Sequence, residues 1–222
     1  MDFKSIMSLF REDDWTRNLV EKLDEMLMLS GAIFDHALGV VLGTVEDVDP
    51  KEPVYDRDKR INKLMRKIRR RVVARLSIDK HGAEVPTALI FMNAVKDAER
   101  IGDYGKNLYE IAAMQPDTPD ADLYQAWLGP RGERISDLMD RTRKAFARSD
   151  DTLAARVIAD SRQLGRECEE AIREITATVT SVRDAVALVL ALRFYKRIVG
   201  HLSNIATTVV MPVDMLDFHD ED

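Results

Sequence analysis

Apolar residues recur at steps of three and four along most of the chain, and this spacing limits the possible folds more than any other feature. Such steps return a side chain to the same face of an α-helix. The clearest stripe consists of Ile61, Leu64, Met65, Ile68, Val72 and Leu76. No comparably long stretch alternates with the period of two that is typical of a β-strand. The sequence therefore predicts an all-α protein.

We expect about six main helices in two groups of three, each group folded as an antiparallel three-helix bundle. The first bundle is predicted within residues 1–115 and the second within 116–222, which ends in the acidic tail DFHDED. The proline-bearing segment QPDTPDADLYQAWLGPRGE is interpreted as the linker, with room for one short helical turn at residues 123–127. An internal repeat is suggested by residues near the ends of the third and sixth helices, where Arg100, Ile101 and Asn107 match Arg197, Ile198 and Asn204.

Composition excludes several classes of function. The chain has 33 Lys and Arg against 39 Asp and Glu, and its net charge of −6 argues against general nucleic-acid binding. The single cysteine, Cys168, excludes an intramolecular disulfide and a CxxC zinc site, and its place on an apolar stripe predicts a buried, inert thiol. The sequence contains no P-loop, GxGxxG or GxSxG motif, so the enzyme classes that these motifs mark have no support.

The distribution of hydropathy predicts a cytoplasmic protein. The first residues lack the basic start and apolar core of a secretory signal. The longest uninterrupted apolar run, at residues 185–192, is too short to span a bilayer. We therefore expect a soluble chain with no membrane-spanning helix.

Glu99 and Asp103 are the strongest candidates for a metal site. Their spacing of four places both carboxylates on one side of a helix, about one turn apart. Oxygen ligands of this kind suit divalent or iron-type metals, and Asp56 or Asp58 from the preceding helix could complete the set. The alternative is a solvated polar stripe, in which Arg100 offsets the two carboxylates without any metal.

A second candidate site is the strongly basic helix at residues 57–75. Its ten Lys and Arg against one Asp give a local charge of +9, so the other residues must carry −15 to reach the net −6. The face opposite the apolar stripe contains Lys59, Lys63, Arg66, Lys67 and Arg70. This face could dock on acidic lipid headgroups or on an acidic partner. The alternative is a solvated face that pairs with acidic residues of the same chain.

The first long helix has apolar residues outside its main stripe. Met26, Ile33 and Val40 are predicted to leave an apolar area on its surface. Exposed apolar area beyond about a few hundred Å² usually marks an interface. We therefore expect self-association as a homodimer.

Residues 54–112 resemble the PhoU family. The resemblance rests on the strings VYDRDKRINKLMRKIRRRVVARL and ALIFMNAVKDAERIGDYGKNLYEIA. The family's ERIGD-type motif is matched by Glu99, Arg100, Gly102, Asp103 and Asn107. The family is built from two tandem three-helix bundles, so the resemblance extends over nearly the whole chain. The second half departs from the pattern, because it has Lys196 and Gly200 where the family places acids.

The resemblance implies a regulator and not a catalyst. PhoU proteins negatively regulate phosphate uptake and phosphate-responsive signalling, at the cytoplasmic face of a phosphate transporter and a sensor kinase. The family is also associated with metal clusters, which implies one metal site around Glu99 and Asp103 and none in the second half. Two alternatives stay open at this point: a metal-binding or metal-storing helical protein, and an accessory subunit of an ion-coupled phosphate carrier.

Overall fold

The computed structural model describes residues 14–46, 49, 51–116 and 119–212, and this part of the chain is all-helical, as the periodicity predicts. The acidic tail lies outside the described residues. Two short helical segments, η1 (Lys51–Asp56) and η2 (Ile111–Met114), flank the long helices. The six long helices of the described part are α2 (Asp14–Val41), α3 (Arg57–Leu76), α4 (Val85–Glu110), α5 (Ala121–Arg148), α6 (Asp151–Thr178) and α7 (Val182–Val210).

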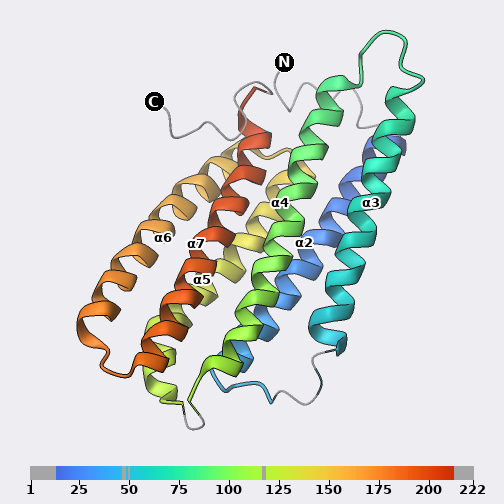
Figure 1. The fold of residues 1–222 in the computed structure, drawn as a ribbon. Helices are drawn as coiled ribbons and strands as arrows, with labels where there is room; N and C mark the ends of the chain where they lie inside the picture. Colours follow the sequence, from blue (N-terminus) through green and yellow to red (C-terminus); the bar gives the residue numbers. More distant parts are fainter. Residues whose placement is uncertain (1–13, 47–48, 50, 117–118, 213–222) are drawn as a thin grey trace.

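The long helices run side by side, and their direction alternates along the chain (Figure 1). Within each half the three consecutive helices contact one another, which gives an antiparallel three-helix group at each side. The two groups meet along the middle of the molecule, where α4 packs on α7 and α2 packs on α5. Buried apolar side chains from all six helices form one continuous core. The division at residues 115 and 116 into two bundles stays a prediction.

The predicted linker at residues 115–133 is mostly helix, and in this respect the sequence interpretation is wrong. The α5 helix starts directly after Asp120, whose side chain accepts a hydrogen bond of 3.1 Å from the backbone N–H of Leu123. Pro130 lies inside the helix, although it removes one helical hydrogen bond. The fully buried Tyr124 shows why the helix persists here: packing against the core offsets that loss.

The apolar residues outside the main stripe of the first helix are not exposed. Met26 and Ile33 have no exposed surface, and Val40 is 9% exposed. They are buried because α2 packs on α5 as well as on α3 and α4. A further contact across the two halves joins Phe34 of α2 to Tyr195 of α7, with ring centroids 5.6 Å apart. The surface that suggests a dimer is thus used within the chain, and the homodimer stays a prediction without that support.

Two smaller expectations concern Cys168 and the membrane. Cys168 is fully buried, and burial raises the pKa of its thiol to about 12, so the thiol stays protonated at neutral pH. None of the helices in the described part combines the length and hydropathy that a bilayer crossing requires.

Candidate functional site

The acidic motif of the first half forms a cluster between α3 and α4. Glu99 and Asp103 lie one turn apart on α4, with side chains 19% and 27% exposed. The first turn of α3 contributes Asp58, whose carboxylate shares the ammonium group of Lys106 with Asp103 at N–O distances of 3.7 and 3.6 Å. Asp56 does not join the cluster, because it forms an ion pair of 3.0 Å with Lys59.

Cationic side chains compensate the charge of this cluster. Nη1 of Arg100 lies 3.2 Å from Asp103 Oδ2, and its Nε lies 3.8 Å from Glu99 Oε2. Within the described ranges, no group of three or more His, Cys, Asp or Glu is arranged to hold a metal ion. The residues as arranged therefore fit charge compensation by Arg and Lys better than a metal centre. A metal at Glu99 and Asp103 stays a prediction.

The environment of Glu99 raises the pKa of its carboxyl above the ordinary value. Burial is the largest cause, and the nearby carboxylates of Asp103 and Asp58 add to it, while Arg100 and Arg69 act in the opposite direction. The folded protein therefore binds a proton at Glu99 more readily than the unfolded chain does. The contribution of Glu99 to the free energy of unfolding is most favourable at pH values below the pKa that its carboxyl has in the unfolded chain. It is lost as the pH rises through the higher pKa that the carboxyl has in the folded protein.

This sign gives a testable result for Glu99→Gln. In protein treated with a chelator, the variant should have a higher free energy of unfolding than the wild type at pH 7. The advantage should disappear below pH ~4, where glutamate is protonated even in the unfolded chain. Urea unfolding at both pH values measures the difference, with the exposed Glu133→Gln as the control. A loss of stability at pH 7 would contradict the account.

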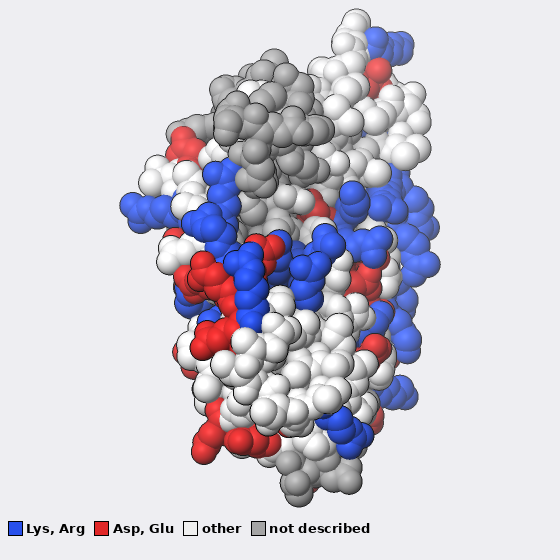
Figure 2. Space-filling model, turned by 60° about the vertical axis from the view of Figure 1, so that its left-hand side comes forward, with Lys and Arg blue, Asp and Glu red and all other residues white. Residues whose placement is uncertain are grey.

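The basic residues of α3 lie on its exposed face, as predicted. Figure 2 shows Lys and Arg gathered along the edge of the molecule on which α3 lies. Lys59 pairs with Asp56. No ion pair with a carboxylate of the described residues is found for the other four members: Lys63, Arg66, Lys67 and Arg70. Ion pairs within the described residues therefore do not compensate most of this face, and both alternatives, a docking face and a solvated face, stay predictions.

Other basic residues of α3 do pair internally, and they were not among the candidates. Arg60 forms an ion pair with Glu25 of α2, and Arg75 binds Glu84 at the start of α4 at 2.6 Å. The basic helix therefore has two sides. Arg60 and Arg75 form ion pairs with neighbouring helices, whereas the side chains on the outer face form no ion pair with a described carboxylate. We call this outer face, made of Lys63, Arg66, Lys67 and Arg70, the basic face.

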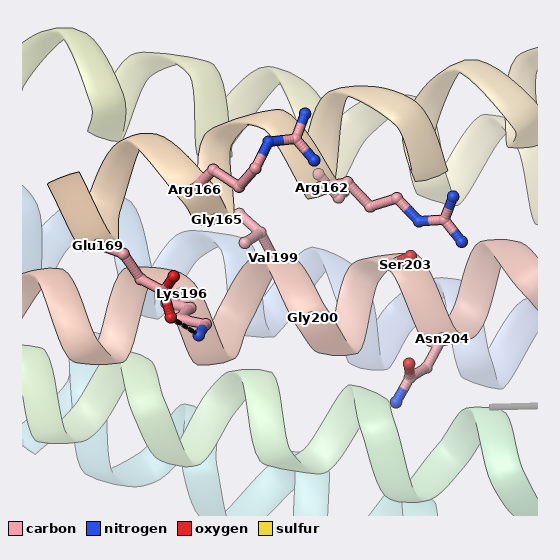
Figure 3. Close-up of a pocket in the computed structure, with 10 residues that line it drawn as sticks. Arg162, Gly165, Arg166, Glu169, Lys196, Val199, Gly200, Ser203 and Asn204 are labelled. Carbon is pink, nitrogen blue, oxygen red and sulfur yellow. Dashed lines mark hydrogen bonds and ion pairs between the residues drawn. The ribbon is translucent and has the colours of Figure 1, made fainter. Parts of the chain in front are cut away.

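In the second half, the positions that match the acidic motif line a groove between α6 and α7 (Figure 3). Lys196 pairs with Glu169 of α6, and Gly200 leaves the helix surface open. The opposite wall bears Arg162 and Arg166, which sequence reasoning missed. Their spacing of four on one helix was the available signal, but only the packing of α6 on α7 places them opposite Gly200. The expected absence of metal there stays a prediction.

Comparisons with known proteins agree with this architecture. The family model described as "PhoU domain" matches residues 23–112 and 132–209, one segment in each half. A search of curated proteins found no match. The fold is similar to the crystal structure of PhoU from Pseudomonas aeruginosa, with a TM-score of 0.75 and 23% sequence identity. That alignment covers 89% of this chain and 96% of the other.

Proposed function

The chain belongs to the PhoU domain family, and we propose that it is a cytoplasmic adaptor that negatively regulates phosphate uptake and phosphate-responsive signalling. The observation that carries the proposal is the family match, which covers most of both halves. In this role the chain binds the inner side of a phosphate transporter or a sensor kinase and performs no catalysis. Its position is peripheral to the membrane.

The basic face of α3 supports the docking part of the proposal. Its four cations lie within about two turns of one helix and have no carboxylate partner among the described residues. A concentration of like charge without internal compensation attracts an acidic surface and is screened by salt. We therefore assign this face to contact with an acidic partner surface at the membrane.

The alternatives have less support. Storage of metal requires several metal-binding side chains together, and the carboxylates around Glu99 and Asp103 face Arg100 and Lys106. No feature of the described residues favours an ion-coupled phosphate carrier over another transporter as the partner. We therefore retain regulation through docking as the proposed function.

Reversing the charge of the basic face should abolish regulation. In a strain that lacks the native gene, the wild type should restore low phosphate uptake and repression of a phosphate-responsive reporter at high phosphate. The variant Lys63→Glu, Arg66→Glu, Lys67→Glu and Arg70→Glu should leave both readouts at the level of the deletion strain. In the same experiment, inner-membrane vesicles should retain the wild type at low salt and release it at high salt, because the contact is electrostatic.

The control carries the same change of charge elsewhere on the surface. It replaces four other exposed cations by Glu: Arg148, Arg156, Arg173 and Arg183. This control should regulate like the wild type, and both variants should retain the helical far-UV spectrum. Full regulation by the basic-face variant would refute docking through α3, while absence of regulation by the wild type itself would refute the proposed function.

A further inference from the structure

The groove between α6 and α7 is open because small residues line it on both sides. Its volume is about 330 Å³, near the lower end of the ~300–1,000 Å³ of known ligand pockets. Among the described residues, a Cβ at Gly200 would meet no atom within 4 Å, and a Cβ at Gly165 would reach Val199 alone, at 3.8 Å. The hollow therefore has room for a small ligand close to the backbone of both helices.

The side chains around the groove include three cationic donors. Arg162 extends from α6 along the groove toward Ser203, Arg166 lines the α6 side with its guanidinium lying over α6, and Lys196 reaches the groove from α7 (Figure 3). Among the described residues of the lining, Glu169 is the only acid, and it pairs with Lys196. Three cations against one carboxylate leave a charge of +2. Because the planar guanidinium group donates two parallel hydrogen bonds, it matches the oxygens of phosphate or carboxylate groups.

Two buried serines form the floor of the groove. Ser161 is 2% exposed and Ser203 is 3% exposed, whereas both arginines are exposed and form the rim. The Ser161 hydroxyl has no hydrogen-bond partner among the described residues. A buried hydroxyl without a partner costs about 1–3 kcal/mol, so it is expected to acquire one. A ligand oxygen deep in the groove would supply that partner after rotation of the hydroxyl.

From these features we infer that the groove binds a phosphate group, either as free inorganic phosphate or as the end of a small phosphate monoester. The lining offers guanidinium, ammonium and hydroxyl donors, and its charge of +2 matches a phosphate dianion. The limited volume favours one phosphate group over a nucleotide. The charge of this groove is thus opposite in sign to that of the matching positions in the first half, where Glu99 and Asp103 present carboxylates. The inference does not depend on the proposed regulatory function.

Calorimetric titration of the full chain tests the site. The probes are inorganic phosphate and glycerol 3-phosphate, each titrated in chloride buffer at pH 7.5. We expect the wild type to bind at least one of them, and Arg162→Gln with Arg166→Gln to weaken binding at least about tenfold, because charge-assisted hydrogen bonds are lost. Tighter binding of inorganic phosphate would identify the free ion as the ligand, and tighter binding of glycerol 3-phosphate would identify a monoester.

Two further variants separate the site from general effects of charge and folding. Gly200→Leu fills the hollow without changing charge, and it should abolish binding while the thermal unfolding midpoint stays within a few degrees of wild type. Arg156→Gln with Arg173→Gln removes two other exposed cations of α6 and should leave the affinity unchanged. The inference is overturned if the wild type binds neither probe, if Gly200→Leu binds normally, or if the Arg156 and Arg173 control loses as much affinity as the groove variant.

Discussion

Phe91→Ala is expected to lower the free energy of unfolding by about 3–5 kcal/mol, the usual cost of removing a buried phenyl ring. Phe91 has no exposed surface, and its ring packs edge-on against Phe146 of α5 with centroids 5.7 Å apart. An edge-on aromatic pair adds about 0.5–1.5 kcal/mol beyond its buried area. Because the two rings belong to different halves of the chain, the loss should weaken both halves together.

Urea unfolding followed by tryptophan fluorescence can resolve the two halves. Trp15 lies in α2 and Trp127 in α5, so Trp127→Phe leaves a reporter in the first half and Trp15→Phe leaves one in the second. In both backgrounds Phe91→Ala should shift the unfolding midpoint equally. The partly buried Phe194, which packs on Tyr104 with centroids 5.9 Å apart, provides a control whose replacement by Ala should cost less. A shift seen only by Trp15 would mean that residues 1–115 unfold as an independent domain.

The second large effect is expected for Arg75→Ala, at about 3 kcal/mol. The carboxylate of Glu84 is only 7% exposed and accepts hydrogen bonds from Arg75 Nε at 3.0 Å and Nη2 at 2.6 Å. Removing one partner of a buried ion pair costs about 3–5 kcal/mol, because the other charge stays buried without compensation. Arg75 is 35% exposed, which places the expected loss at the lower end of that range. The guanidinium also lies 5.4 Å from the ring centroid of Trp15, so the substitution removes this contact as well.

A double mutant identifies the buried charge as the cause. Adding Glu84→Gln to Arg75→Ala should recover a large part of the lost stability, because a neutral amide is easier to bury than a carboxylate. Lys144→Ala serves as the comparison, since its ion pair with Asp140 is half-exposed and should be worth about 0.3–0.5 kcal/mol. Equal losses for Arg75→Ala and the double mutant would show that packing of the arginine, and not the charge of Glu84, dominates.

Local signals in the sequence located most of the helices. The stripe from Ile61 to Leu76 lies within α3. A serine three residues before an acid, Ser181 before Asp184, is a local signal of a helix start, and the Ser181 side chain accepts a hydrogen bond from the N–H of Asp184 at the start of α7. The start of α5 was misplaced because Pro130 and the prolines before it are typical of a loop. Tertiary packing of residues such as Tyr124 overrode that local preference.

For the candidate sites as well, the sequence predicted what depends on residues close together in the chain and missed what depends on contacts between helices. Spacing placed Glu99 and Asp103 on one side of a helix, and the cations of the basic face on another. It did not show that Lys106 would join Asp58 to Asp103, or that Arg60 and Arg75 would pair with acids on neighbouring helices. Those contacts depend on which helices are neighbours and on how each helix is rotated about its axis. The helical periodicity of the sequence gives no information about either.

The sequence by itself determined that this protein is all-α, which face of most helices is apolar, and to which family it belongs. The first two follow from residues a few positions apart, whose relative placement is fixed by the 3.6-residue helical turn. The family follows from the match of the sequence to the PhoU domain model. Only the tertiary structure decided that Met26 and Ile33 are buried, because the side of α2 on which they lie is covered by neighbouring helices; Gly105 of α4, for example, lies directly against Ile33. It also decided that Arg162 and Arg166 face Gly200 across a groove, because that juxtaposition arises from the packing of α6 on α7.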